Sequence, residues 1–167
     1  MAKSKLKDYI YRPEFECMTR TEMENLQSER LRKTVELVYN NCKPYRAKMD
    51  EFKIKPSDIR SVSDLSKLPF TVKHDLREAY PFGFYSSPSR DIVEVHASSG
   101  TTGKLTVVGY TQNDIDVWAE IAARSLAMAG VTKDSLVHVA YGYGLFTGGL
   151  GAHYGAQKIG ASTVPAS

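Results

Sequence analysis

Apolar residues recur at helical spacing in the first part of the chain and in short runs in its last part. The clearest helix is predicted to begin after Thr19, which forms a capping-box sequence with Glu22, and to end near Tyr39. Its apolar positions, which we expect to face a core, are Met23, Leu26, Arg30 (through its stem), Leu31, Val35 and Val38. The opposite, polar face is expected to include Ser28.

Shorter helical segments are predicted along the rest of the first ninety residues. In chain order they cover 44–52, short turns within 56–69, and a helix that starts over 71–77. Residues 12–18 are expected to be irregular because Pro13 disfavours an early helix. We therefore interpret residues 1–90 as a small helical cap domain.

From residue 91 onward, short apolar strands alternate with helices. The predicted strands cover 91–97, 106–110, 136–140 and 162–165. The predicted helices cover 112–129, with Ile115, Trp118, Ile121, Ala122, Leu126 and Ala129 on its apolar face, and 148–159. This alternation is typical of an α/β protein with a doubly wound, mainly parallel sheet. We interpret 91–167 as the first part of such a domain, truncated because the chain stops at the carboxyl end of a strand.

Composition narrows the class of protein. Hydrophobic residues make up 42% and charged residues 25% of the 167 positions, as in ordinary globular domains. The net charge of +3 is too small to predict nucleic-acid binding, and no apolar run is long enough to span a membrane. Cys17 and Cys42 are expected to be reduced thiols of a cytoplasmic protein. The four histidines are scattered without metal-ligand spacing, so no metal site is expected.

The stretch from His96 to Lys104 carries the strongest chemical signal. Its glycines allow backbone N–H groups to turn inward, and such a nest, with hydroxyls and an ammonium beside it, suits a polyphosphate. The candidate phosphate-binding residues are Ser98, Ser99, Gly100, Thr101, Thr102, Gly103 and Lys104. A solvated polar turn between two strands is the alternative that composition alone leaves open.

This loop is not a Walker A motif. That motif requires glycine five positions before its Gly-Lys pair and Ser or Thr after the lysine, where this chain has Ser98 and Leu105. Because a strand is predicted after Lys104, the loop is expected to form a β-hairpin without the help of a helix dipole.

A second glycine-rich stretch, Tyr141-Gly-Tyr-Gly-Leu-Phe-Thr-Gly-Gly149, lies between a predicted buried strand and a helix, at the edge of the sheet where ligands bind. The third glycine of a dinucleotide fingerprint would fall at Thr147, so that fingerprint fails. Aromatic residues between glycines suit a flat slot for a planar ligand. Packing of Tyr141, Tyr143 and Phe146 onto the sheet is the alternative, and both stay open.

The hydroxyl-rich stretch, followed by Thr106-Val-Val-Gly-Tyr-Thr111, resembles the phosphate loop of adenylate-forming acyl-CoA ligases. The stretch Tyr141-Gly-Tyr-Gly-Leu-Phe-Thr-Gly-Gly-Leu-Gly-Ala-His-Tyr-Gly155 is similar to phenylacetate–CoA ligases, and Leu68-Pro-Phe-Thr71 and Tyr80-Pro-Phe-Gly83 resemble that family's N-terminal cap. The likeness covers almost the whole chain. One departure is Leu105, which replaces the family's usual proline and is expected to loosen the hairpin without removing a phosphate donor.

The resemblance implies an AMP-forming acid–thiol ligase that joins an aryl acid, phenylacetate, to coenzyme A in two steps, with ATP and Mg²⁺. It implies that 98–104 hold the β- and γ-phosphates, that Lys73 adds a phosphate contact, and that Tyr141 and Phe146 line the aryl pocket. It also implies that residues needed to complete the reaction follow position 167. The chain alone is therefore expected to be inactive, as the N-terminal part of a longer ligase or as a split subunit, and self-association is possible. A non-catalytic nucleotide-binding fragment is the alternative function.

Overall fold

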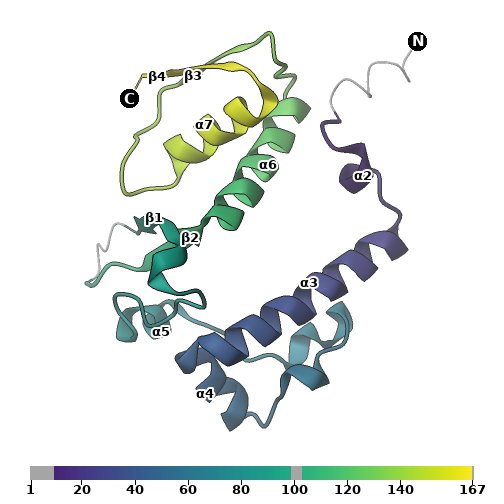
Figure 1. Ribbon diagram of the computed structural model, residues 1–167, viewed down its shortest axis with the longest axis vertical. Coiled ribbons are helices and arrows are strands. Elements are labelled where there is room, and N and C mark those ends of the chain that lie inside the picture. Colours follow the sequence, from purple (N-terminus) through teal and green to yellow (C-terminus); the bar gives the residue numbers. More distant parts are fainter. Residues whose placement is uncertain (1–9, 99–102, 167) are drawn as a thin grey trace. The chain divides into compact units, whose positions relative to one another are not determined.

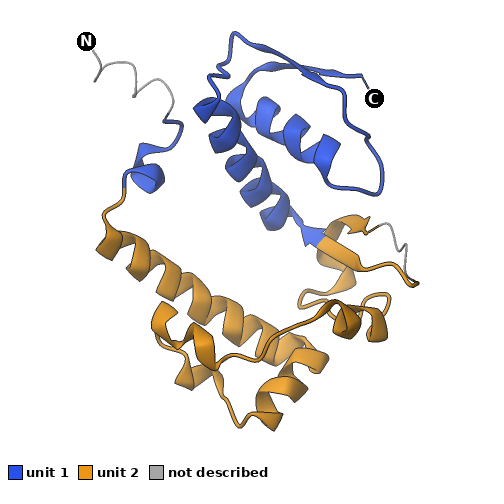
Figure 2. Ribbon diagram, turned by 180° about the vertical axis from the view of Figure 1, so that it is seen from behind, with its two compact units in different colours: residues 1–17, 110–167 blue, residues 18–109 orange. Residues whose placement is uncertain are grey.

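The computed structural model describes residues 10–98 and 103–166 (Figure 1). It consists of two compact units, and the chain enters the first of them twice. Unit 1 comprises Met1–Cys17 together with Tyr110–Ser167, and unit 2 comprises Met18–Gly109 (Figure 2). The predicted division into domains 1–90 and 91–167 concerns the whole protein and stays a prediction.

Unit 2 is mainly helical, as the sequence predicts. Its helices are α3 (Arg20–Asn41), α4 (Lys43–Glu51) and α5 (Lys73–Glu78), with 3-10 turns η2 (Pro56–Asp58), η3 (Val62–Lys67) and η4 (Ser89–Asp91). The predicted capping box at the start of α3 is confirmed, because Thr19 accepts a hydrogen bond from the backbone N–H of Glu22 while the Glu22 carboxylate accepts from the Thr19 N–H at 2.8 Å. It fixes the first turn of the longest described helix.

The core of unit 2 is small and lies where α3, α4 and the 3-10 turns meet. Val35, Met49 and Ile59 are buried there to 2% exposure or less. Two predictions for α3 are wrong. The Arg30 side chain is exposed, and Ser28, placed on the polar face, is buried with its hydroxyl oxygen accepting a 3.1 Å bond from the backbone N–H of Val62. This bond makes burial of the serine tolerable and ties η3 to α3.

The two strands around the hydroxyl-rich loop form a two-stranded sheet. They are β1 (Ile92–Ala97) and β2 (Val107–Thr111), close to the predicted ranges. The connection over 98–106 is shorter than a parallel crossover needs, so the pair is a hairpin. A strand does follow Lys104, which confirms the context that separates this loop from a Walker A motif.

Unit 1 contains a parallel strand–helix–strand arrangement. Its elements are α2 (Pro13–Glu16), α6 (Gln112–Met128), β3 (Leu136–Val139), α7 (Gly148–Ile159) and β4 (Ser162–Pro165). Strand β3 pairs in parallel with β4 from Leu136 opposite Ser162 to Val139 opposite Pro165, and α7 supplies the crossover between them. The α/β class is thus confirmed. The described strands form two separate two-stranded sheets, and the predicted doubly wound sheet stays a prediction.

The helical turn α2 corrects the expectation of an irregular segment over 12–18. Pro13 occupies the first turn, where its missing N–H costs nothing, so it starts this short helix and does not prevent it. Side chains then fasten the segment to α6 and α7. Arg12 pairs with Glu120 at 2.8 Å, the guanidinium groups of Arg12 and Arg124 lie 5.0 and 4.9 Å from the centre of the Phe15 ring, and the hydroxyl of Tyr11 donates to the carbonyl of Lys158 at 2.9 Å.

Helices α6 and α7 pack closely because their shared surface carries small residues. A Cβ atom at Gly155 would lie 2.7 Å from the Cβ of Ala122 and 3.0 Å from the backbone nitrogen of Ala123. The buried side of α6 consists of Ala119, Ala123 and Ala127. The predicted apolar face was therefore wrong in part, because Ile121 is 56% exposed and Ala129 lies beyond the helix end.

None of the helices in the described part of the chain combines the length and the apolarity that crossing a bilayer would take.

We expect Gly155→Ala to destabilise unit 1. Alanine gains about 1 kcal/mol of helix propensity over glycine, but the added methyl group collides with backbone and side-chain atoms of α6, and overpacking costs about 1–3 kcal/mol. The free energy of unfolding should fall by up to about 2 kcal/mol, measured in urea from the fluorescence of Trp118, the single tryptophan. Gly144→Ala is the control, because nothing lies within 4 Å of a Cβ there. Equal stability of the two variants would contradict close packing at Gly155.

Candidate phosphate and aryl-acid site

Two hydrogen bonds close the base of the hydroxyl-rich hairpin. The backbone N–H of Ser98 donates to the carbonyl of Thr106 at 3.0 Å, and the N–H of Thr106 donates to the Ser98 hydroxyl oxygen at 3.2 Å. The Ser98 amide is therefore used within the chain, whereas its hydroxyl keeps a hydrogen that can be donated to a ligand. The next four candidate residues, Ser99, Gly100, Thr101 and Thr102, lie outside the described residues.

The end of the same loop carries a cation on the surface. Gly103 has a φ of 130°, a region that favours glycine, and Lys104 beside it is exposed. The Lys104 ammonium lies 5.9 Å from the centre of the Tyr80 ring, within the range of a cation–π contact. Tyr80 was not predicted as the neighbour that orients this lysine, because no spacing rule connects the two residues.

Strand β2, which follows the loop, packs against the ring of Tyr85. A Cβ at Gly109 would lie 2.6 Å from the Cζ atom of Tyr85, so only glycine lets the strand approach the ring. The Tyr85 ring also contacts Phe82 at a centroid distance of 5.1 Å, and burial raises the pKa of the Tyr85 hydroxyl. This aromatic support holds the strand that follows Lys104.

His96, the first residue of the candidate stretch, is buried in β1. It is 2% exposed, and its Nε2 atom lies 2.5 Å from a carboxylate oxygen of Glu94. The interpretation as an ordinary core or surface histidine is consistent with this burial.

The structure places Lys73 at the start of α5, exposed to solvent. Helix α5 is held to α4 by Asp75, whose carboxylate accepts from the Lys48 ammonium at 2.5 Å and from the Val72 N–H at 2.8 Å. The hydrogen bond from Lys48, followed by that from Val72, lowers the pKa of Asp75. Lys73 thus stands on a short helix anchored by a charged pair.

The aromatic–glycine stretch turns directly into α7. The Tyr141 ring lies over Gly148, where a Cβ would be 2.3 Å from its Cε1 atom, and a Cβ at Gly149 would be 2.6 Å from the carbonyl oxygen of Gly142. Tyr141 is nevertheless 64% exposed and Phe146 is 52% exposed. Both predicted substrate contacts therefore offer much of their rings to a ligand.

Tyr143 lies between these two in the sequence, and its ring contacts α7. Its hydroxyl lies 3.0 Å from the Nδ1 atom of His153 on α7, and the two rings meet edge to face at a centroid distance of 5.6 Å. Tyr143 therefore packs against α7. The candidate phosphate residues belong to unit 2 and the candidate aryl-acid residues to unit 1, and each group is described within its own unit.

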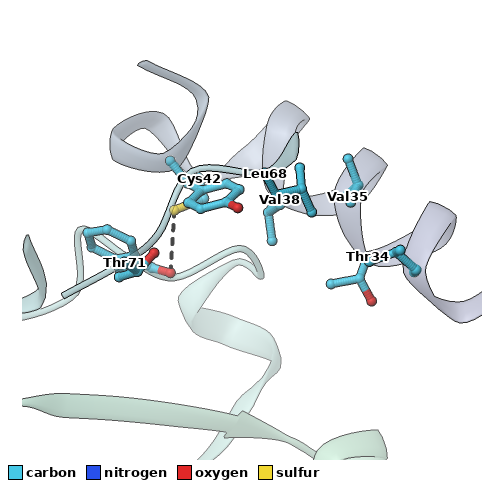
Figure 3. Close-up of a pocket in the computed structure, with 9 residues that line it drawn as sticks. Thr34, Val35, Val38, Cys42, Leu68 and Thr71 are labelled. Atoms are coloured by element: carbon cyan, nitrogen blue, oxygen red, sulfur yellow. Dashed lines mark hydrogen bonds between the residues drawn. The ribbon is translucent and has the colours of Figure 1, made fainter. Parts of the chain in front are cut away.

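Unit 2 also contains an apolar pocket of about 260 Å³ that the sequence analysis did not predict (Figure 3). Its lining residues are Leu31, Thr34, Val35, Val38, Cys42, Tyr45, Leu68, Thr71 and Phe84. The Cys42 thiol donates to the carbonyl of Phe84 at 3.7 Å, and burial raises its pKa. None of the predicted site residues lines this pocket.

Comparison with solved structures gives high similarity to 2-hydroxyisobutyryl-CoA ligase. The structure of that enzyme with 2-HIB-AMP and CoA in the thioesterification state has a TM-score of 0.87 and 30% identity, covering 95% of this chain and 35% of that chain. An open conformation of the same enzyme with 2-HIB-AMP and CoA has a TM-score of 0.85 and 30% identity, covering 94% of this chain and 37% of that one.

Curated relatives are more similar in sequence. A phenylacetate-coenzyme A ligase of Escherichia coli K12 is 56% identical over 146 residues, or 87% of this chain and 33% of the relative. One of Thermus thermophilus is 51% identical over 158 residues, or 95% and 36%, and one of Pseudomonas putida is 54% identical over 141 residues, or 84% and 32%. The chain spans about a third of the length of these relatives. No family model matches the sequence.

The fold of this chain thus matches part of an acyl-CoA ligase, 2-hydroxyisobutyryl-CoA ligase. Along most of its own length the chain is similar to curated phenylacetate-CoA ligases, at 51–56% identity.

We expect Asp75→Asn to reduce the acid sensitivity of unit 2. The folded-state pKa of Asp75 lies below its ordinary value of 3.8, so its stabilising effect is present above that pH and is lost as the pH falls through the folded-state value. Circular dichroism in urea should show a smaller loss of stability from pH 6 to pH 3 in the variant than in the parent chain. Asp134→Asn, at an exposed turn in unit 1, serves as the control. An unchanged pH dependence in Asp75→Asn would refute the role of the Lys48 pair.

Cys42 and Cys17 should differ in reactivity. Cys42 is 2% exposed and its thiol pKa is raised, whereas Cys17 is exposed. Iodoacetamide at pH 7.5 should therefore alkylate Cys42 at least roughly tenfold more slowly than Cys17, because the thiolate is the reactive form and access to Cys42 is limited. Mass spectrometry of the digested chain reports both rates. The difference should vanish in denaturant, and equal rates in the native chain would show that the pocket does not protect the thiol.

Proposed function

We propose that the whole protein is an AMP-forming ligase that joins phenylacetate, or a close aryl acid, to coenzyme A, and that this chain contributes its polyphosphate loop and part of its aryl-acid pocket. The observation that carries the proposal is the 51% identity over 158 of 167 positions to a phenylacetate-coenzyme A ligase. A match of that length includes the hydroxyl-rich hairpin and the aromatic–glycine stretch together.

In the first proposed step, the substrate carboxylate attacks the α-phosphorus of ATP, giving an acyl-adenylate and pyrophosphate. The carboxylate is already ionised at neutral pH, so this step needs positioning and charge neutralisation and no base. The residues proposed to hold the departing β- and γ-phosphates are Ser98, Ser99, Gly100, Thr101, Thr102, Gly103 and Lys104. The exposed Lys104 ammonium and the unused hydroxyl hydrogen of Ser98 support this role. Lys73 is proposed as an additional phosphate contact from α5.

In the second proposed step, the coenzyme A thiol displaces AMP from the adenylate to give the thioester. Mg²⁺ would enter with ATP, bound through the phosphates, as it commonly is. The described residues contain no group of three or more His, Cys, Asp or Glu side chains placed to hold a metal ion. We place this reaction in the cytoplasm, where ATP and reduced thiols are found.

The aryl ring of the substrate is proposed to lie against Tyr141 and Phe146. Support comes from their exposed rings and from the open space beside Gly142 and Gly144, where a Cβ would meet nothing within 4 Å. Glycines without a packing reason are consistent with a backbone that a ligand approaches closely. The doubly wound sheet is proposed to be completed in the whole protein, with β3 and β4 as two of its strands.

The test uses a full-length chimera in which this chain replaces the matching third of the Escherichia coli ligase. With ATP, Mg²⁺, coenzyme A and phenylacetate, the chimera should release AMP and form phenylacetyl-CoA. Absence of both products, across several aryl acids and with a correctly folded chimera, would refute the proposed function.

Lys104→Ala in the chimera should raise the KM for ATP or lower kcat by roughly tenfold to a hundredfold, because a charged hydrogen bond of about 1.5–3 kcal/mol is lost. The KM for phenylacetate should change little. Lys43→Ala, which removes an exposed lysine from the start of α4, is the matched control. Full activity of the Lys104 variant would contradict the assignment of this loop to the phosphate site, but it would not contradict the proposed reaction.

A further inference from the structure

A continuous series of ring contacts runs through unit 1 and ends in the aromatic–glycine stretch. Tyr110 stacks on Trp118 at 5.5 Å, and Trp118 meets Tyr154 edge to face at 5.7 Å. His153, next to Tyr154 with ring centres 6.3 Å apart, then meets Tyr143 at 5.6 Å. Edge-to-face and stacked pairs at these distances are favourable and directional. Tyr143 is therefore attached to the packed part of the unit.

The attachment falls at the centre of a glycine-rich stretch. Gly142 and Gly144 flank Tyr143 and make no side-chain contacts by nature, and the space beside them is open. Glycine loses more conformational entropy on ordering than any other residue, so a segment of this composition needs an external constraint. The 3.0 Å bond between the Tyr143 hydroxyl and Nδ1 of His153 supplies one.

His153 is held more firmly than the segment that it contacts. It lies on the second turn of α7, between Gly151 and Gly155, the two glycines that let α7 approach α6. At Gly151 a Cβ would lie 2.8 Å from the Trp118 indole, so the helix backbone packs closely against that ring. The hydrogen bond with His153 therefore restrains Tyr143 relative to the packed helices α6 and α7.

We propose that His153 is a positioning residue of the aryl-acid site, and that it fixes the exposed rings of Tyr141 and Phe146 by holding Tyr143 between them. This inference rests on the proposed function. His153 acts through Tyr143 and contacts neither the nucleotide nor the reacting carboxylate. Its loss should therefore weaken binding of the aryl acid and leave the phosphate steps unchanged.

The first test measures kinetics in the chimera. Tyr143→Phe and His153→Leu should each raise the KM for phenylacetate roughly fivefold, the factor expected for one neutral hydrogen bond, while kcat and the KM for ATP change less than about twofold. His153→Asn, which returns an acceptor near the position of Nδ1, should restore most of the KM. His138→Leu, at an exposed histidine on β3, is the control and should behave as the parent. Equal effects on both KM values, or no effect on either, would overturn the proposal.

The second test measures the loop without any activity. Chymotrypsin should cut the 167-residue chain after Tyr141 or Phe146 several times faster in Tyr143→Phe and His153→Leu than in the parent, because a loosened segment fits a protease more readily. Cleavage after Phe70, which is 91% exposed in unit 2, serves as the internal reference. Unchanged cleavage at 141 and 146 would overturn the proposal even if the KM changed. An inactive chimera would contradict the proposed function, while the cleavage rates would still decide whether His153 fixes the loop.

Discussion

The close approach of α6 and α7 is the constraint on which the rest of unit 1 depends. It requires the absence of a side chain at Gly151 and Gly155, since a Cβ at either position would collide with Trp118 or with the backbone of α6. Glycine in a helix interior costs about 1 kcal/mol relative to alanine, and dense contact across the small-residue surface offsets that cost. With the two helices in place, the β3–α7–β4 crossover and the entry of the aromatic–glycine stretch into α7 are both determined.

The hairpin of unit 2 is stabilised by a different set of contacts. The Ser98–Thr106 pair closes its base, and Tyr85 supports β2 at Gly109, so the loop is carried on a defined platform. A fixed base reduces the conformational entropy that a loop loses when it binds a ligand. Lys104, at the edge of the platform, has an aromatic neighbour in Tyr80 that directs its flexible chain without consuming its three N–H donors.

The sequence allowed most element positions to be predicted, because capping boxes and glycine C-caps are local signals. Thr111 with Asp114 forms a capping box at the start of α6, and the left-handed Gly160 ends α7. The errors arise where tertiary contact overrides local pattern. Ser28 is buried because a distant backbone N–H satisfies it, and Ile121 is exposed because the alanine side of α6 fits the glycines of α7 better than a branched side chain would. Tyr143 and His153 were beyond reach for the same reason, since neither residue has a spacing signature for the other.

The attachment of residues 11–16 has a consequence for how the protein acquires its structure. Arg12 pairs with Glu120, which lies 108 positions away in the sequence, and Tyr11 donates to the carbonyl of Lys158, which lies 147 positions away. Contacts of such long separation close only after a large loss of chain entropy. During synthesis this early segment therefore makes its long-range contacts only after the whole of unit 2 has emerged and folded. Among the described residues, some of the first to be synthesised are thus among the last to reach their native contacts.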